Sequence, residues 1–328
     1  GYVFDTDGTL LHIPREEGYK NTSYCKGKAG ANVQNVPRME IYRGFIFASL
    51  ATQGQDLVSW LGISTSSFDN AIDRSPTGEI EITGGSLRYM HDANWKILLE
   101  NVTDNMHPQV THQSAFQPAK QLGMKYSDKD KPLALAMLEP FGSSYDFLDE
   151  IKMTVCGIGH SYTGGAVSIH SAYPKESQYV KKMQLQYGED RTNKILSMNR
   201  QNTIIYPSIA FKSALQTIRI YRPVAVNKTI QETWTYKLKG APDDMLENSV
   251  LYNHMIFSPA SIAGHDDYEA YHRIQHGLSN NASDWVSQHR HMNSDSINED
   301  GTRSAPGTSD IVFRHEFEAW KHYMTNTV

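Results

Sequence analysis

Residues 94–112 read NWKILLENVTDNMHPQVTH, and this stretch organises the rest of the chain. It begins apolar and aromatic and then supplies one carboxylate and two imidazoles. Asp104 and His107 are three residues apart, so they share a face where the segment is helical. His107 and His112 are five residues apart, about 140° around an ideal helix, which is too far for two ligands of one ion.

Pro108 removes this difficulty. A proline inside a helix cannot donate to the carbonyl four residues earlier, and it restricts the residue before it. We therefore expect the helix to kink or break at Pro108, which lets both imidazoles turn toward one point. Two histidines and one carboxylate are the facial arrangement of non-haem Fe(II), although imidazole also binds zinc, copper and nickel. In a chain with 14 histidines, the pair alone also fits two polar residues that flank a helix.

A third ligand is offered by the acidic pair Asp266-Asp267. The pair opens a segment in which Tyr271, Ile274 and Leu278 follow at helical spacing. Carboxylates at the start of a helix are also favoured by the helix dipole, so a purely structural role stays open. One of two adjacent carboxylates can face a metal while the other stays solvated.

The order of several motifs carries a resemblance. Asn94-Trp95-Lys96 precedes Asp104-x-x-His107 and His112, and the acidic pair is followed by Arg273-Ile274-Gln275-x-Gly277-Leu278. Shorter matches lie at residues 42–48, 204–207, 218–223, 239–242, 307–310 and 319–321. Together they resemble the catalytic domain of the Rieske non-haem iron ring-hydroxylating oxygenases, large (alpha) subunit.

The resemblance implies roles for the residues of the metal motif. His107 and His112 match the two imidazole ligands, and Asp267 matches the carboxylate ligand, with Asp266 as the fallback. Asp104 matches a catalytic residue that is not a ligand and that lies between the iron and the Rieske cluster of a neighbouring subunit. Asn101 lies one residue closer to Asp104 than in the naphthalene-type enzymes, so its role stays open.

Candidates for the substrate pocket are weaker. Met106, Val110, Asn202 and Phe257 match positions that line the pocket in the family, and an ordinary core position is the alternative for each. Arginines at 219, 222 and 273 could receive a carboxylated substrate through two parallel hydrogen bonds. Salt bridges at the surface or at strand ends are the interpretation we favour for these arginines.

The resemblance also implies cofactors and partners. These are Fe(II), a [2Fe-2S] Rieske cluster, NAD(P)H acting through a reductase, a ferredoxin or reductase partner, a small aromatic substrate and O₂. Family members form homotrimers or α₃β₃ complexes with a small beta subunit. Neither Cys25 nor Cys156 has a Cys or His at cluster spacing. We therefore expect the cluster in an upstream domain, with residues 1–50 as the C-terminal remnant of that Rieske-type β domain and linker, and residues 51–328 as the catalytic mononuclear-iron domain.

Composition excludes several other classes. The 328 residues are 39% hydrophobic with a net charge of −5, which is enough for a real core and argues against nucleic acid. No apolar run reaches the 18 residues that a membrane helix needs, and we expect no signal peptide. The two cysteines favour a reducing cytoplasm.

The predicted fold is α+β, an antiparallel sheet covered by helices. The resemblance implies a helix-grip (START-like) form, in which the sheet wraps around a long helix. We expect strands at 79–83 and 87–90 around a Gly84-Gly85-Ser86 turn, at 167–170, and at least three between 202 and 239. Helices are expected at 178–198 and at the C-terminus, where Phe313, Phe317 and Trp320 form an apolar stripe. Residues 279–309 predict a long loop.

Three functional classes follow from this pattern. The first is an Fe(II)- and O₂-dependent hydroxylase of aromatic rings, acting as a dioxygenase or monooxygenase. The second is a hydrolase with zinc at the same three ligands, because the ligands alone do not select iron. The third is a grip-fold protein that binds a ligand without catalysis.

Overall fold

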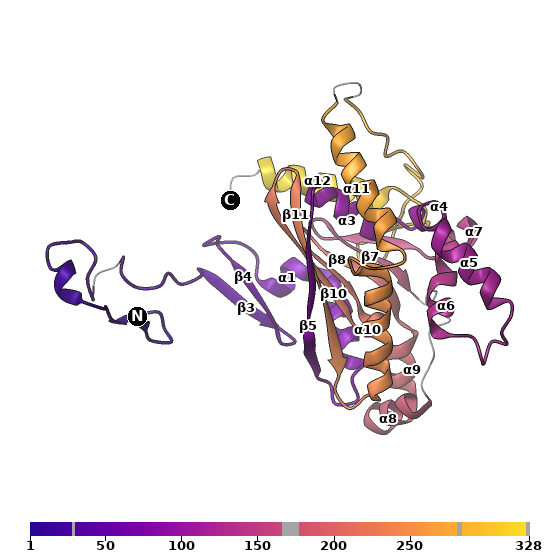
Figure 1. Cartoon of the computed structure of the whole chain (residues 1–328), viewed down its shortest axis with the longest axis horizontal. Coiled ribbons are helices and arrows are strands. Elements are labelled where there is room, and N and C mark those ends of the chain that lie inside the picture. Colours follow the sequence, from indigo (N-terminus) through magenta and orange to yellow (C-terminus); the bar gives the residue numbers. More distant parts are fainter. Residues whose placement is uncertain (28–29, 166–176, 281–283, 326–328) are drawn as a thin grey trace. The chain divides into compact units, whose positions relative to one another are not determined.

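The computed structural model describes residues 1–27, 30–165, 177–280 and 284–325 (Figure 1). The chain divides into two compact units between Leu57 and Val58. A strand expected at 167–170 lies outside the described residues. None of the described helices is long and apolar enough to cross a bilayer.

The first unit consists of two small hairpins. Gly8, at φ 88°, allows the turn that joins the first pair, and Arg43 and Gly44, both at positive φ, form the two-residue turn of the second. Leu10, Ile13 and Ala31 form a small core. The elements are β1 (Val3–Phe4), β2 (Leu10–His12), η1 (Glu16–Tyr19), β3 (Arg38–Tyr42) and β4 (Phe45–Ser49).

The second unit is built on one nine-stranded sheet in the order β12-β13-β6-β7-β8-β9-β10-β11-β5. Every pairing in it is antiparallel. Most strands lie beside their neighbours in the sequence, which explains why alternation along 202–239 predicted them correctly. The strands are β5 (Ile80–His91), β6 (Met153–Cys156), β7 (His160–Gly165), β8 (Asn199–Ile205), β9 (Ile209–Lys212), β10 (Thr217–Ala225), β11 (Lys228–Leu238), β12 (Ser296–Ile297) and β13 (Arg303–Ala305).

Helices flank this sheet (Figure 1). They are α1 (Leu57–Leu61), η2 (Gly62–Ser64), α2 (Thr65–Asp73), α3 (Trp95–Thr103), α4 (His107–Thr111), α5 (Gln113–Gly123), α6 (Leu133–Leu138), η3 (Glu139–Gly142), α7 (Tyr145–Glu150), α8 (Ser177–Tyr187), α9 (Glu189–Ser197), η4 (Ser213–Leu215), α10 (Asp243–Phe257), α11 (Gly264–Leu278) and α12 (Ile311–Thr325). The predicted α+β class is therefore confirmed.

The two faces of the sheet have different neighbours because side chains alternate along each strand. On β9, Phe211 packs against Phe68 of α2, with ring centroids 5.1 Å apart. Ala210, which points to the other face, joins Leu98 of α3 and Tyr221 of β10 in one buried cluster. The second face, covered by α3 and α10, is the one that carries the site described below.

Three sequence-based expectations need correction. Gly84-Gly85-Ser86 does not turn the chain, because β5 continues through it as one strand with an irregularity in its pairing to β11. Gly85, at φ 87°, supplies the backbone conformation that such a bulge requires. The 178–198 helix is broken at Gly188 into α8 and α9. The loop at 279–309 contains two short strands, the edge strand β12 and its neighbour β13.

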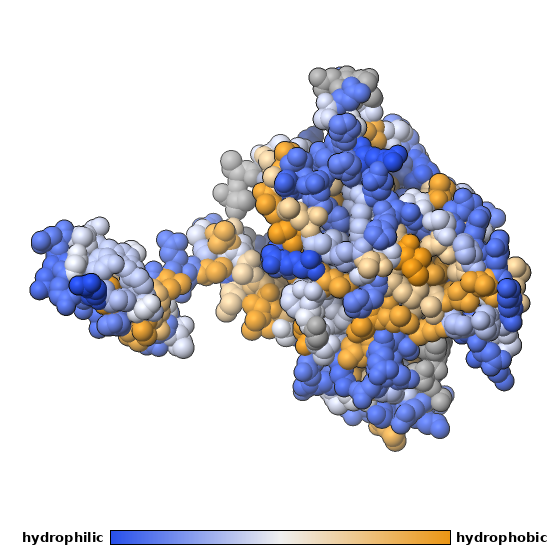
Figure 2. Space-filling view, in the orientation of Figure 1, coloured by the Kyte–Doolittle hydropathy of each residue, from blue (hydrophilic) through white to orange (hydrophobic). Residues whose placement is uncertain are grey.

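The predicted apolar faces of two helices are also partly wrong. In α12 the buried face consists of Ile311, Val312, His315, Glu316 and Ala319, whereas Phe317 and Trp320 are 37% and 40% exposed. In α11, Tyr271 is buried, but Ile274 and Leu278 are 49% and 58% exposed on a helix whose visible surface is mainly hydrophilic (Figure 2). Apolar spacing marked the helices correctly but did not identify which face packs.

Candidate metal centre

The helix break falls slightly earlier than expected. The Asn94 side chain caps α3 by accepting the Lys96 N–H at 3.1 Å, and α3 ends at Thr103. The next helix, α4, begins at His107, so Pro108 lies in its first turn, where a missing N–H costs nothing. The break therefore spans residues 104–106 rather than Pro108 itself.

Asp104 defines this break. Its carboxylate accepts the N–H of Met106 at 2.9 Å and that of His107 at 3.2 Å, which caps the start of α4. The same carboxylate lies 3.4 Å from Nδ1 of His107. Asp104 is thus not a member of the ligand cluster; it fixes the backbone and the ring of a ligand candidate.

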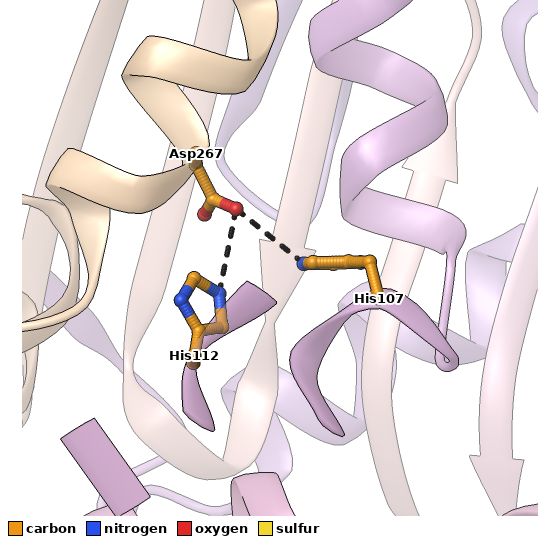
Figure 3. A group of neighbouring side chains, drawn as sticks. All are labelled: His107, His112 and Asp267. Carbon is orange, nitrogen blue, oxygen red and sulfur yellow. Dashed lines mark ion pairs between the residues drawn. The ribbon is translucent and has the colours of Figure 1, made fainter. Parts of the chain in front are cut away.

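Three side chains converge on one point, as the sequence predicted (Figure 3). His107 and His112 flank α4, and Asp267 lies in the first turn of α11. Oδ1 of Asp267 is 3.6 Å from Nε2 of His107 and 3.4 Å from Nε2 of His112. One ligand atom from each residue lies within 4.8 Å of the others, a spacing that accommodates one ion with bonds of about 2 Å.

The donor set fits a divalent transition metal. Nδ1 of His107 faces Asp104, and Nδ1 of His112 lies 3.4 Å from Oδ2 of Asp266. In each ring the outer nitrogen therefore meets a carboxylate, which is the usual way of orienting a metal-binding imidazole. Asp266 is 32% exposed and contacts only the outer side of His112, so Asp267 is the better placed of the two acids.

The carboxylates shift the titration of these histidines. Burial opposes the charged form of His107, but Asp104 and Asp267 outweigh it and raise its pKa. For His112 burial dominates, and its pKa is lowered despite Asp267 and Asp266. Burial alone would raise the pKa of Asp104, but the contact with His107 and the N–H of Met106 lower it. Metal binding requires the neutral imidazole, so it competes with protonation of His107.

Asn101 is a site residue whose role the sequence left open. Its Nδ2 lies 3.1 Å from Nε2 of His107 and 3.1 Å from Oδ1 of Asp267. It sits on the last turns of α3, next to the convergence point. The shorter spacing to Asp104 therefore does not remove Asn101 from the site.

A cavity of about 630 Å³, counting the part open to solvent, adjoins the three side chains. Asn202 and Phe257 line it, as expected for pocket residues. Met106 and Val110 do not, and Val110 is 70% exposed, because the face of α4 that carries the ligands turns these side chains elsewhere. Sequence reasoning did not anticipate other residues of the wall: Phe141, Leu148, Gln201, Lys212, Tyr252 and Ile256.

Fold and site together define a mixed helix and antiparallel-sheet protein with a His-His-Asp cluster beside a cavity. Residues 81–305 match the family model described as ring hydroxylating alpha subunit (catalytic domain). The chain therefore belongs to the ring-hydroxylating oxygenase alpha-subunit family.

Known proteins agree with this assignment. The chain is 26% identical to toluate 1,2-dioxygenase subunit alpha of Pseudomonas putida over 87% of its length, and 28% identical to the anthranilate 1,2-dioxygenase large subunit of Acinetobacter baylyi over 87%. It spans 63% and 59% of those two proteins. The crystal structure of naphthalene 1,2-dioxygenase from Rhodococcus sp. bound to indole has the same fold, with a TM-score of 0.73, 18% identity and coverage of 99% of this chain and 74% of that one.

Proposed function

We propose that this chain is the catalytic part of a terminal oxygenase that hydroxylates an aromatic ring with O₂ at a mononuclear Fe(II) site. The observation that carries this proposal is the convergence of His107, His112 and Asp267 at the wall of a cavity. Iron bound there would supply the redox chemistry that activates O₂. The helix-grip form and the Rieske-type origin of residues 1–50 belong to the same proposal.

The cavity is suited to a small aromatic molecule. Phe141, Leu148, Ile256 and Phe257 give it apolar walls, as is usual in pockets that bind small organic molecules. Phe141 packs edge-on against His112 with ring centroids 5.4 Å apart, so one wall of the pocket also holds a proposed ligand in place. A substrate ring in this cavity would lie next to the proposed metal ligands.

Asp104 has a different part in the proposal. Its Oδ2 lies 3.4 Å from Nδ1 of His107, the ring nitrogen that does not face Asp267. The side chain of Asp104 is 23% exposed. We assign it the passage of electrons toward the site, from a Rieske cluster in a neighbouring subunit of a homotrimer or an α₃β₃ complex. Electrons would reach that cluster from NAD(P)H through a reductase or ferredoxin.

The names of the relatives support an aromatic substrate, but they do not agree on the substituent that its ring carries. Two relatives are named for the aromatic acids toluate and anthranilate, and the solved structure is named for the hydrocarbon naphthalene. Their shared feature is an aromatic ring that receives oxygen. The substituent must be inferred from the cavity.

The test uses the full-length, cluster-containing protein with its reductase chain. We expect about one iron per chain beyond the cluster, and ¹⁸O from ¹⁸O₂ in the product, with two labelled atoms for dioxygenation and one for monooxygenation. The His112→Ala variant is the matched control and should incorporate none. Zinc in place of iron, with ester hydrolysis, would favour the hydrolase alternative. Ligand binding without any turnover would favour a non-catalytic protein.

A further inference from the structure

Two cations lie on the sheet side of the cavity. Lys212 of β9 and Arg219 of β10 both line it, and they are only 8% and 5% exposed. In the antiparallel pairing Arg219 lies opposite Ala210, two residues from Lys212. The two side chains are therefore diagonal neighbours on one face of the sheet.

Neither cation has an acidic partner. Nζ of Lys212 lies 3.4 Å from the Tyr252 hydroxyl, and Nη2 of Arg219 lies 3.4 Å from Oδ1 of Asn202. The buried Nε of Arg219 has no hydrogen-bond partner. Within the described part of the chain, no ion pair joins Lys212 or Arg219 to a carboxylate.

The carboxylates of the cavity are used elsewhere. Asp104 and Asp267 are the acidic residues of its wall, and both face His107. Phe257 contributes its ring, 4.4 Å from the Arg219 guanidinium and 5.8 Å from the Lys212 ammonium. Such contacts offset only part of the cost of burying two positive charges.

We propose that Lys212 and Arg219 form an anion subsite that receives the carboxylate of an aromatic carboxylic acid, which is the substrate class of this cavity. The inference rests on the proposed oxygenase function and deepens it. The guanidinium fork of arginine matches a carboxylate through two parallel hydrogen bonds, and an ammonium adds a point charge. The aromatic part of the acid would then lie against Phe257 and extend toward the metal ligands.

The titration of Lys212 fits the proposed subsite. Burial, and to a lesser extent the charge of Arg219, lower the pKa of this ammonium to about 7. A bound carboxylate would favour the charged form again. The sequence-based preference for salt bridges holds at the other two arginines, since Arg222 pairs with Glu232 and Arg273 with Glu269. For Arg219 the prediction of a salt bridge is wrong.

The first test measures binding to the metal-free full chain, so that no metal can hold the carboxylate. Calorimetric titration compares benzoate with benzamide, which has the same shape and no charge, and with acetate, which has the charge and no ring. We expect benzoate to bind at least about tenfold more tightly than either. Equal affinity for benzoate and benzamide would overturn the subsite, and equal affinity for benzoate and acetate would overturn the aromatic assignment.

The second test uses variants of the two cations. Lys212→Met and Arg219→Met should each weaken benzoate binding about tenfold or more and leave benzamide binding unchanged. Arg222→Met is the matched control, because it removes an arginine from the same strand that is paired with Glu232 and 56% exposed. Unchanged benzoate affinity in Lys212→Met would overturn the proposal. If Arg219→Met does not fold, the benzoate affinity of Lys212→Met and the comparison of benzoate with benzamide in the wild type still test the subsite.

The outcomes separate this inference from the proposed function. Benzoate that binds selectively but receives no ¹⁸O in the iron-loaded, full-length protein would leave the subsite standing and remove the oxygenase. Toluene that is oxygenated by a protein with no preference for benzoate would do the reverse.

Discussion

The Asp104 carboxylate contacts both the backbone and the ring of His107. It accepts the His107 N–H at 3.2 Å, and its Oδ2 lies 3.4 Å from Nδ1 of the imidazole. One residue therefore ends α3, starts α4 and meets the outer nitrogen of a proposed metal ligand. Its charge and its capping role can be separated experimentally, because asparagine retains a carbonyl acceptor.

We predict that Asp104→Asn retains its iron and its fold but loses nearly all turnover. The amide oxygen can still accept one of the two N–H groups that the carboxylate accepts, from Met106 or from His107, so the break between the helices should survive. What is lost is the charge beside Nδ1, on which an oriented, charge-assisted contact toward the neighbouring cluster would depend. Iron content and single-turnover product are measured together in the full-length protein.

Two outcomes would contradict this assignment. Full turnover in Asp104→Asn would reduce Asp104 to a helix cap. Loss of iron would make it a ligand, and Asp267 would then lose that role.

The two adjacent acids of α11 should behave differently. Asp267→Ala, like His107→Ala and His112→Ala, is expected to lose iron, because Asp267 reaches both Nε2 atoms. Asp266 contacts the outer nitrogen of His112 and the Ser114 hydroxyl, but neither Nε2 atom, so Asp266→Ala should weaken iron binding by about tenfold at most. Iron content after desalting distinguishes them, and the opposite order would exchange the roles of the two acids.

The sequence predicted the cluster of His107, His112 and Asp267 but only half of the residues expected to line the pocket, for a physical reason. His107 is the first residue of α4 and His112 directly follows its last, so local structure alone sets the relation of the two imidazoles. Arg219 and Lys212 meet only through the register of β9 and β10, which alternation along a single strand does not reveal. Alternation predicted the strands, but not which charged side chain would point into the core.

The remaining errors have the same origin. Val110 is close to both histidines in sequence, yet the short helix α4 directs it to solvent. Gly84-Gly85-Ser86 has the composition of a turn, but a long neighbouring strand pairs across it and makes it a bulge. At Gly84-Gly85-Ser86, pairing with a distant strand therefore outweighs the local signal.

Metal removal should destabilise the second unit. Binding to the folded state alone at about 100 times the dissociation constant contributes about 2.7 kcal/mol, which corresponds to a rise in Tm of about 5–10 °C. We expect this rise when Fe(II) is added anaerobically to the metal-free protein, and its reversal by a chelator. His112→Ala is the control and should melt at one temperature with or without iron. An equal rise in that variant would place the metal elsewhere.

The buried ammonium of Lys212 should make stability depend on pH. In the unfolded chain a lysine has a pKa of about 10.4, whereas in the folded protein the pKa of Lys212 is about 7. Between these pH values the unfolded chain binds more protons, so the free energy of unfolding should rise with pH. Below pH 7 the full cost of the buried charge remains, and above about pH 10 it disappears.

Replacing Lys212 with methionine should therefore stabilise the metal-free protein at pH 6. The expected gain is a few kcal/mol, on the order of 1.4 kcal/mol per pKa unit, and it should shrink toward zero at pH 10. Urea unfolding at pH 6, 8 and 10 measures it, and Lys181→Met, on the exposed side of α8, controls for the loss of a lysine. Benzoate should stabilise the wild type more than Lys212→Met, since only the wild type keeps the ammonium. If Lys212→Met has a lower free energy of unfolding than the wild type at pH 6, Lys212 stabilises the fold and the anion subsite is contradicted.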